Sequence, residues 1–429
     1  MGAGAMKKVL LIAYHFPPVK GSSGLHRTLA MARYLPEFGW QPAVLSASPR
    51  AYEHTSNELL QQVPQDLLVK RAFALDATRH LSVKGRYFQT MALPDRWSSW
   101  WLGGVASGLR MIKQFKPDLL WSTYPIATAH LIGLSLHKLT GIPWVVDFRD
   151  SMTEENYPVN QKVRSTYRWV ERKAVQSAAK SVFTTPGAVD MYAARYPDIP
   201  HNRWAVIENA VDEDFVCQIE TQLRSKGRQR EQKLTFVHSG ILYPSERDPT
   251  QFFNALSHLK KKQAISCAEV EFILRASSNE EAYSRQTEKL DIADLVFFEP
   301  AIPYAAAIEE MFKADGLLIF QASNCNHQIP AKIYEYFRSG RPILGLTDAA
   351  GNTAELLRQE SGTMVAALDD EEEIVNNLFK FIQFCRECRD QSVRNVEGKY
   401  SRRKRVEQYA DILNRYSSVR LGNCTQPKK

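Results

Sequence analysis

Cysteine is scarce in this chain, and its spacing excludes a disulfide framework. The 429 residues include 6 cysteines, all of which lie after residue 216 at irregular intervals. Small secreted domains depend on dense and regular cysteines, so this distribution favours a reducing cytoplasm. The one CxxC, formed by Cys385 and Cys388, has no second pair or neighbouring histidines. We therefore expect neither a zinc site nor a redox site there.

Long hydrophobic runs are also missing. The longest apolar stretch, roughly 130–146, is interrupted by Lys138, Gly141 and Pro143, which predicts no membrane-spanning helix. The start of the chain has two lysines before only a short apolar run, which favours a first strand over a signal peptide. Glycine and proline, at 21 each, are near average and no unit repeats, so collagen-like and solenoid folds are excluded.

The charge is uneven along the chain. The formal net charge is +8, but residues 1–210 hold 25 basic and 15 acidic residues, whereas residues 211–429 hold 30 and 32. The first half therefore carries a balance of +10 and the second a balance of −2. An excess of this kind suits an anionic membrane surface, although ordinary solvated side chains explain much of it; we expect no nucleic-acid partner.

Short β-rich runs alternate with longer helical patterns twice along the chain. The first series includes KKVLLIAY, DLLWSTY and WVVDF, and the second includes LTFVHSG, GLLIFQ and PILGLTD. This alternation predicts an α/β fold of two Rossmann-like, doubly wound domains, whose strand ends should meet at a shared cleft. We expect a first domain at 6–211, a charge-dense linker at 212–233, a second domain at 234–395 and a C-terminal helix at 396–418 that could return to the first domain.

Three segments at strand ends carry candidate site residues. Gly21 and Gly24 follow the first strand and precede a helix, an arrangement that suits a diphosphate but is also common in plain turns. The strand PWVVDFRD ends in Asp147, Arg149 and Asp150, which either line a site or tie down a loop.

The segment IPAKIYEYFRSGRPIL places Lys332 and Glu335 in the first turns of a helix. A cation at this position suits phosphate, and a carboxylate one turn later can accept hydrogen bonds from ribose hydroxyls. The alternative is an ion pair on the helix surface.

Together these motifs resemble GT-B glycosyltransferases of the family 4 type, in the branch that builds bacterial surface polysaccharides. The segments that carry the resemblance cover nearly the whole chain: YHFPPVKGSSGLHR, LPDRWSSWW, KPDLLWSTYP, GIPWVVDFRD, ENAVD, HSGILYPSERDP and IPAKIYEYFRSGRPIL. The resemblance implies a nucleotide-sugar donor on the second domain, an acceptor on the first and transfer with retention of configuration.

Carried over residue by residue, the resemblance assigns Gly240, Arg247 and Lys332 to the donor diphosphate and Glu335 to the ribose, with Gly24 closing on the phosphates. The family's first glutamate is replaced by His327, which is then expected at the sugar. Where many relatives have a histidine at the end of the strand that here reads WVVDFRD, this chain offers Arg149 and Asp150 as candidate catalytic groups, and we favour Asp150. Further departures are Arg275-Ala276 and Glu299-Pro300, which replace family glycines.

Two further features flank these motifs. His15 and His26 border the glycine loop, where a structural role is the more common one. Arg79, Lys84 and Arg86 precede a cluster formed by Arg96, Trp97, Trp100 and Trp101. This cluster either rests on a membrane interface or packs beneath a loop.

The leading interpretation is a retaining glycosyltransferase that transfers a sugar from a nucleotide diphosphate to a glycan or lipid-linked acceptor. We expect it to need no metal or other cofactor, since cations of the protein can neutralise the leaving diphosphate. We expect it in the cytoplasm, peripherally at the inner membrane face. Two alternatives stay open: a nucleotide-sugar 2-epimerase, and a GT-B protein that binds nucleotide or glycan without catalysis.

Overall fold

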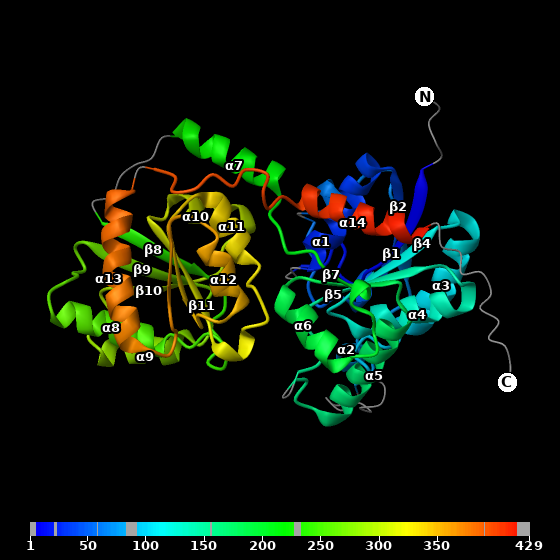
Figure 1. Cartoon of the computed structure of the whole chain (residues 1–429), viewed down its shortest axis with the longest axis horizontal. Coiled ribbons are helices and arrows are strands. Elements are labelled where there is room, and N and C mark those ends of the chain that lie inside the picture. Colours follow the sequence, from blue (N-terminus) through cyan, green and yellow to red (C-terminus); the bar gives the residue numbers. More distant parts are fainter. Residues whose placement is uncertain are drawn as a thin grey trace. The chain divides into compact units, whose positions relative to one another are not determined.

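The structure, a computed structural model, describes residues 6–20, 24–57, 59–82, 92–154, 157–226, 233–389 and 391–417. The chain forms two compact units (Figure 1). The first comprises residues 1–208 and 402–429, and the second comprises residues 209–401. Gly21, Lys84 and Arg86, singled out above, lie outside the described residues.

The first unit is built on a parallel sheet of seven strands in the order β3-β2-β1-β4-β5-β6-β7. The strands are β1 (Lys7–Ile12), β2 (Trp40–Ala47), β3 (Leu68–Ala72), β4 (Leu119–Thr123), β5 (Trp144–Arg149), β6 (Lys180–Phe183) and β7 (Trp204–Val206). Its helices are α1 (Gly24–Tyr34), α2 (Ala77–His80), α3 (Trp100–Phe115), α4 (Ala127–Thr140), α5 (Gln161–Ser177), α6 (Pro186–Arg195) and α14 (Arg402–Ser417).

The second unit has a parallel sheet of six strands in the order β10-β9-β8-β11-β12-β13. The strands are β8 (Leu234–Ser239), β9 (Val270–Arg275), β10 (Val296–Glu299), β11 (Gly316–Gln321), β12 (Ile343–Thr347) and β13 (Thr363–Ala366). Its helices are α7 (Glu213–Lys226), α8 (Thr250–Lys261), α9 (Glu280–Lys289), α10 (Tyr304–Lys313), α11 (Lys332–Ser339), α12 (Asn352–Arg358) and α13 (Glu371–Glu387).

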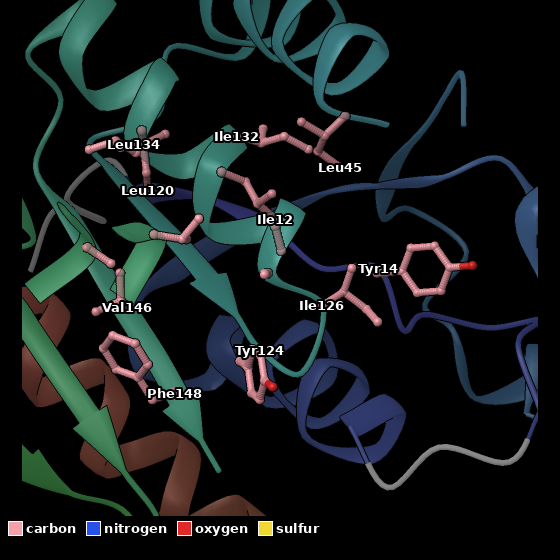
Figure 2. Close-up of a cluster of buried hydrophobic side chains, with 14 of the residues drawn as sticks. Ile12, Tyr14, Leu45, Leu120, Tyr124, Ile126, Ile132, Leu134, Val146 and Phe148 are labelled. Carbon is pink, nitrogen blue, oxygen red and sulfur yellow. The ribbon is translucent and has the colours of Figure 1, made fainter. Parts of the chain in front are cut away.

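The buried strands are apolar on both faces because helices cover both sides of each sheet. In the first unit, side chains of β1, β2, β4 and β5 pack against the apolar face of α4, which contributes Ile132 and Leu134 (Figure 2). The opposite face of the same sheet packs against α1 and α14. The predicted α/β fold with two doubly wound units is therefore confirmed.

The strand order reverses between β1 and β4 in the first unit and between β8 and β11 in the second. In doubly wound sheets, ligands bind outside the carboxyl ends of the strands at such a reversal. The segments after β1 and β8 hold Gly24 and Gly240, so the candidate residues lie where this rule places a ligand.

The predicted linker at 212–233 needs correction over residues 213–226, which belong to the second unit. Residues 213–226 form α7, whose Val216 and Ile219 are buried in the core of the second unit against α10. These side chains recur at helical spacing among many charges, so the charge content concealed an apolar stripe. The chain enters the second unit after Glu208 and leaves it after Ser401.

The C-terminal helix α14 packs on the first unit, and residues 396–401 of its predicted range belong to the second. The Tyr409 hydroxyl donates a hydrogen bond of 2.8 Å to Asp147 Oδ1 at β5, and Asn414 Oδ1 accepts one from the Lys7 ammonium and one from the Trp40 indole. These contacts make α14 an integral part of the first unit.

Candidate functional site

The clearest constellation lies at the carboxyl end of β8. Gly240 follows this strand with φ +121°, a backbone conformation that favours glycine. A Cβ atom at this position would lie 3.1 Å from the ammonium nitrogen of Lys332 on α11. The Lys332 ammonium therefore approaches the Gly240 backbone in the space that a side chain at position 240 would occupy. We call the region formed by His238, Gly240, Arg247, Lys332 and Glu335 the second-unit corner.

The Lys332 ammonium is held by a buried histidine. Its Nζ lies 3.1 Å from Nε2 of His238, the fifth residue of β8. The His238 Nδ1 lies 2.9 Å from the carbonyl oxygen of Leu318, an acceptor only. Nδ1 therefore carries the proton, and Nε2 is left to accept a hydrogen bond from Lys332.

Electrostatics at the second-unit corner disfavour additional positive charge. Burial, followed by the neighbouring Lys332 and Arg247, holds the pKa of His238 well below its usual range. Burial and Arg247 likewise hold the pKa of Lys332 well below its usual range, against the opposing effect of Glu335. Concentrated positive potential of this kind favours an anion.

Arg247 and Glu335 complete the second-unit corner. The Arg247 guanidinium lies over the Tyr243 ring at 5.4 Å and donates a hydrogen bond of 3.1 Å to the Ile241 carbonyl. Glu335 Oε1 accepts a hydrogen bond of 2.7 Å from the hydroxyl of Tyr304, which stacks on Phe215. Glu335 thus lies one turn after Lys332 on α11, in a fixed orientation.

His327 lies in the loop between β11 and α11, where its Nε2 is 3.3 Å from the side-chain nitrogen of Gln328. The Gln328 carbonyl accepts hydrogen bonds from Gln321 and Thr353. The loop that carries His327 is therefore fixed to β11 and α12.

A second basic group lies at the end of β5 in the first unit. Arg149 is buried, has φ +57° and donates a hydrogen bond of 3.3 Å to the Tyr124 carbonyl. A Cβ atom on Gly24, the first residue of α1, would overlap the Arg149 guanidinium and approach His15. The structure thus brings Arg149 and Gly24 together, and we call this region the first-unit corner.

The two acids beside Arg149 have different surroundings. Asp150 is exposed, whereas Asp147 is fully buried and accepts hydrogen bonds from Thr123 and Tyr409. Arg27 reaches the same carboxylate at 3.5 Å. Asp147 therefore ties β5 to α1 and α14, while the side chain of Asp150 is accessible to a ligand.

Comparison with known proteins identifies the first unit. Residues 24–210 match the model of a family described as glycosyl transferase 4-like domain. The chain carries a glycosyl transferase 4-like domain. Together with the solved structures that share its fold, this match confirms the resemblance to GT-B glycosyltransferases of the family 4 type.

The fold of this chain recurs in several solved structures. Anabaena Alr3699/HepE in complex with UDP and glucose is 15% identical, with a TM-score of 0.63 over 96% of this chain and 100% of that one. WaaG, described as a glycosyltransferase involved in lipopolysaccharide biosynthesis, is 14% identical, with a TM-score of 0.61 over 94% and 99%.

The UDP-GlcNAc 2-epimerase from Neisseria meningitidis is 13% identical, with a TM-score of 0.57 over 96% and 100% of the two chains. Identities this low establish the fold alone. No curated protein sequence matches this glycosyltransferase significantly.

The replaced family glycines of the glycosyltransferase have a structural explanation. Arg275 forms a two-pronged ion pair with Glu310 and donates a hydrogen bond of 2.8 Å to the Pro300 carbonyl. Ala276, which follows, adopts φ +53°, a conformation that a glycine would adopt at lower cost. The missing glycine is evident from the sequence, whereas the ion pair between Arg275 and Glu310 is not.

The two histidines near the glycine loop are neutral. Burial, together with Arg149, lowers the pKa of His15 to about 3. Burial, with Arg402 and Arg149, lowers the pKa of His26 to about 3 as well. Neither histidine is therefore a cation at neutral pH. The positive charge near Gly24 comes from Arg149.

The tryptophan cluster divides between core and surface. Trp100 is fully buried beside Tyr14, and Trp97 donates a hydrogen bond to the Ala51 carbonyl beneath Arg96. Trp101 is 40% exposed and donates a hydrogen bond of 3.0 Å to Ser135 on α4. Only Trp101 of the three therefore offers much of its side chain to a partner.

The remaining features considered in the sequence were the CxxC, a metal site and a membrane-spanning helix. Cys385 of the CxxC is buried in the second core, where burial raises the pKa of its thiol. Among the described residues, no group of three or more His, Cys, Asp or Glu could hold a metal ion. None of the helices described is both long and apolar enough to cross a membrane.

Sequence reasoning missed His238 and Tyr304, which hold Lys332 and Glu335. It also missed a network at Glu171, a buried carboxylate that accepts hydrogen bonds from Thr153, Tyr192 and Arg195. This network fixes the segment that follows Asp150. No spacing signal marks these partners, because they come from elements distant in sequence.

Proposed function

We propose that this glycosyltransferase transfers a sugar from a nucleotide diphosphate sugar, held by the second unit, to a glycan or lipid-linked acceptor in surface polysaccharide synthesis. The approach of Lys332 to Gly240, with Arg247 beside them, is the observation that carries the proposal. Because Gly240 carries no side chain, we expect a phosphate to approach the backbone there, and the two cations attract it. The solved complexes of Anabaena Alr3699/HepE with UDP and with UDP-glucose support this class of donor.

The chemistry follows from charge. When the bond between sugar and diphosphate breaks, negative charge develops on the leaving phosphate, and groups already oriented toward it stabilise the transition state. Lys332 and Arg247 supply that stabilisation, so the proposed reaction needs no metal ion. Glu335 holds the ribose, and His327 lies at the sugar.

Retention of configuration is part of the proposal. In the first unit, the buried Arg149 beside Gly24 and the exposed Asp150 are the groups that we propose for the catalytic role. Product analysis by NMR of the anomeric proton distinguishes retention from inversion.

The first test is a thermal-shift panel with UDP, GDP, ADP and their sugars. A ligand at one hundred times its dissociation constant adds about 2.7 kcal/mol to the free energy of unfolding. Glu335→Gln keeps the size of the side chain but removes its charge, and we expect about tenfold weaker binding of the nucleotide that stabilises the parent. Glu309→Gln, at a half-buried carboxylate of α10 that pairs with Lys313, is the control. Equal affinity of parent and Glu335→Gln would remove Glu335 from the ribose.

Transfer and epimerisation give different products. Incubation with the stabilising nucleotide sugar, with and without a membrane extract, yields a glycosylated acceptor in the first case and a changed free nucleotide sugar in the second. Release of an altered nucleotide sugar without extract would favour the epimerase, whose fold this chain shares.

We also propose that the first unit rests on an anionic membrane surface at the cytoplasmic face. The outer face of α3 exposes Trp101, Leu102 and Leu109, and Phe73 is 59% exposed beside Gly103. Residues 100–140 contain a single acid, Asp118, and four basic residues, Arg110, Lys113, Lys116 and Lys138. Aromatic and aliphatic insertion, combined with attraction of about 1 kcal/mol per basic residue, suits anionic lipid.

Vesicle flotation tests this surface. Binding should require phosphatidylglycerol in phosphatidylcholine vesicles, fall with added salt, and weaken in a variant with Trp101→Ser and Leu102→Ser. Phe379→Ser, at an exposed residue of α13, is the control and should float like the parent. Equal recovery with neutral and anionic vesicles, or none with either, contradicts membrane binding.

A further inference from the structure

We propose that Glu171 and Tyr192 are positioning residues, which hold residues 149–153 after β5 in the orientation that transfer requires. We call residues 149–153 the Asp150 segment. Neither side chain touches the substrate in this proposal, and both act through the backbone that carries Arg149 and Asp150. The inference rests on the proposed function, since it takes Arg149 and Asp150 as the catalytic groups.

The Asp150 segment has a conformation that its own sequence does not enforce. Arg149 has φ +57°, which is uncommon for a residue with a Cβ atom and persists where the surroundings hold it. The register between β5 and β6 also shifts between Asp147 and Arg149, so the sheet does not continue regularly into the segment. A first anchor is Thr184, whose hydroxyl donates a hydrogen bond of 2.7 Å to the Arg149 carbonyl.

Glu171 on α5 supplies the second anchor. Its carboxylate is fully buried and accepts four hydrogen bonds of 2.6 to 3.1 Å, which come from Thr153, Tyr192, Arg195 and Tyr196. Arg195 also donates hydrogen bonds to the hydroxyl and to the carbonyl oxygen of Thr153. Because a buried carboxylate is costly unless such donors satisfy it, the network holds Thr153 in one place.

The two tyrosines of this network differ in what else they contact. The Tyr192 hydroxyl donates to Glu171 Oε2 at 2.8 Å and accepts a hydrogen bond of 3.0 Å from the backbone N–H of Met152. The Tyr196 hydroxyl donates to Oε1 of the same carboxylate at 2.6 Å, and in the described part of the chain it makes no hydrogen bond to the Asp150 segment. Tyr192 therefore links the carboxylate to the Asp150 segment, whereas Tyr196 binds the carboxylate alone.

Tyr192→Phe and Tyr196→Phe form a matched pair of variants. Each removes one hydroxyl that donates to Glu171, so each takes one hydrogen bond from the buried carboxylate. The aromatic ring at position 192 stays in the first core. Only Tyr192→Phe also releases the N–H of Met152. A difference between the two variants therefore reports on the Asp150 segment, because the loss at the carboxylate is common to both.

Hydrogen exchange followed by mass spectrometry measures the Asp150 segment without any ligand. In peptides that span this segment, we expect the amide of Met152 to exchange about tenfold faster in Tyr192→Phe than in the parent, because it has lost its acceptor. In Tyr196→Phe the same peptides should exchange at the parental rate.

Transfer kinetics connect the position of the segment to catalysis. With radiolabelled UDP-glucose, GDP-mannose or ADP-glucose as donor and a membrane extract as acceptor, we expect turnover at saturating donor to fall about tenfold in Tyr192→Phe. Tyr196→Phe should match the parent. The affinity for UDP, GDP or ADP should be unchanged in both variants, since the second unit holds the donor in the proposed function.

Glu171→Gln extends the series. It leaves one acceptor oxygen for four donors, so turnover should fall further than in Tyr192→Phe. Circular dichroism verifies that each variant is folded. If Glu171→Gln does not fold, the comparison of the two tyrosine variants still decides.

The outcomes distinguish this inference from the proposed function. If Tyr192→Phe keeps the parental exchange rate or the parental turnover, or if both tyrosine variants lose turnover equally, the positioning role is wrong and the donor assignment stands. If the parent transfers no sugar from any of the three donors, the proposed function is wrong, and the inference fails with it.

Discussion

The first-unit corner and the second-unit corner both place a cation beside a glycine, but they use different side chains to do so. Each places a basic side chain against a glycine after a strand at or near the reversal of strand order: Arg149 beside Gly24 and Lys332 beside Gly240. An arginine keeps its charge under all physiological conditions, whereas a buried lysine can lose it. The two units therefore present different cations beside these glycines, a planar guanidinium in the first and a compact ammonium in the second.

The backbone differs as well. At the second-unit corner the glycine itself has a positive φ, of +121°, while at the first-unit corner Arg149 has φ +57° and Gly24 begins a regular helix. Left-handed backbone at a non-glycine residue costs about 1 kcal/mol or more and persists where the surroundings enforce it. In the first unit the residue with left-handed backbone is thus Arg149, which carries the functional side chain. In the second unit it is the glycine, which adopts this conformation at little cost.

The largest expected effect follows from removing the Lys332 ammonium. Lys332→Met keeps most of the side-chain volume, and we expect turnover to fall about a hundredfold because the leaving diphosphate loses a charge-assisted contact. Lys313→Met, at an exposed lysine of α10, should match the parent. Steady-state kinetics with the stabilising nucleotide sugar measures the turnover of both variants. Parental turnover in Lys332→Met would show that Lys332 does not stabilise the leaving diphosphate.

A smaller effect separates the two glycines. Gly240→Ala should lower the free energy of unfolding by roughly 1–2 kcal/mol, since alanine is strained at this φ and its Cβ crowds Lys332. Gly39→Ala provides the control, because Gly39 has φ +80° with open space around it, and it reports the backbone cost alone.

Gly24→Ala meets no such backbone penalty, so its effect should appear in turnover through the displaced Arg149. Chemical denaturation and kinetics on the three variants test the contrast. Equal losses of stability at Gly24 and Gly240 would contradict it.

The smallest effect concerns the wall of the second-unit corner. Ala276→Gly should raise the free energy of unfolding by roughly 0.5 kcal/mol, because glycine adopts φ +53° without the Cβ penalty. At Ala322, where φ is −77°, the same change should destabilise the protein by a similar amount. Thermal denaturation of both variants gives the two signs, and a loss at Ala276 would show that the left-handed conformation carries no strain there.

The fold was largely predictable from the sequence because parallel strands that are buried on both faces have continuous apolar sequences, such as VLLI and WVV. One strand was missed, β3 (Leu68–Ala72), whose LVKRA carries charges and lies at the edge of the first sheet. The linker was misread because charged residues outnumber the four apolar side chains along α7. Periodicity, which a charge count ignores, contained the signal.

The candidate site was predictable only in part. Glycines and basic residues at strand ends follow from the rhythm of the fold, so Gly240 and Lys332 could be named in advance. Their partners could not, since His238 lies 94 residues from Lys332 and is joined to it only by the folded sheet. The hydrogen bond to the Leu318 carbonyl, which places the His238 proton on Nδ1, likewise arises from packing and has no counterpart in a motif.

The return of α14 to the first unit has a consequence for synthesis of the chain. Trp40 and Asp147 reach their partners Asn414 and Tyr409 only when the end of the chain has been made. Residues 209–401 must be translated in between, which takes roughly 10–40 s at 5–20 residues per second. The second unit is thus complete in sequence before the first can close, and the face of the first sheet that α14 covers stays exposed on the ribosome throughout that interval.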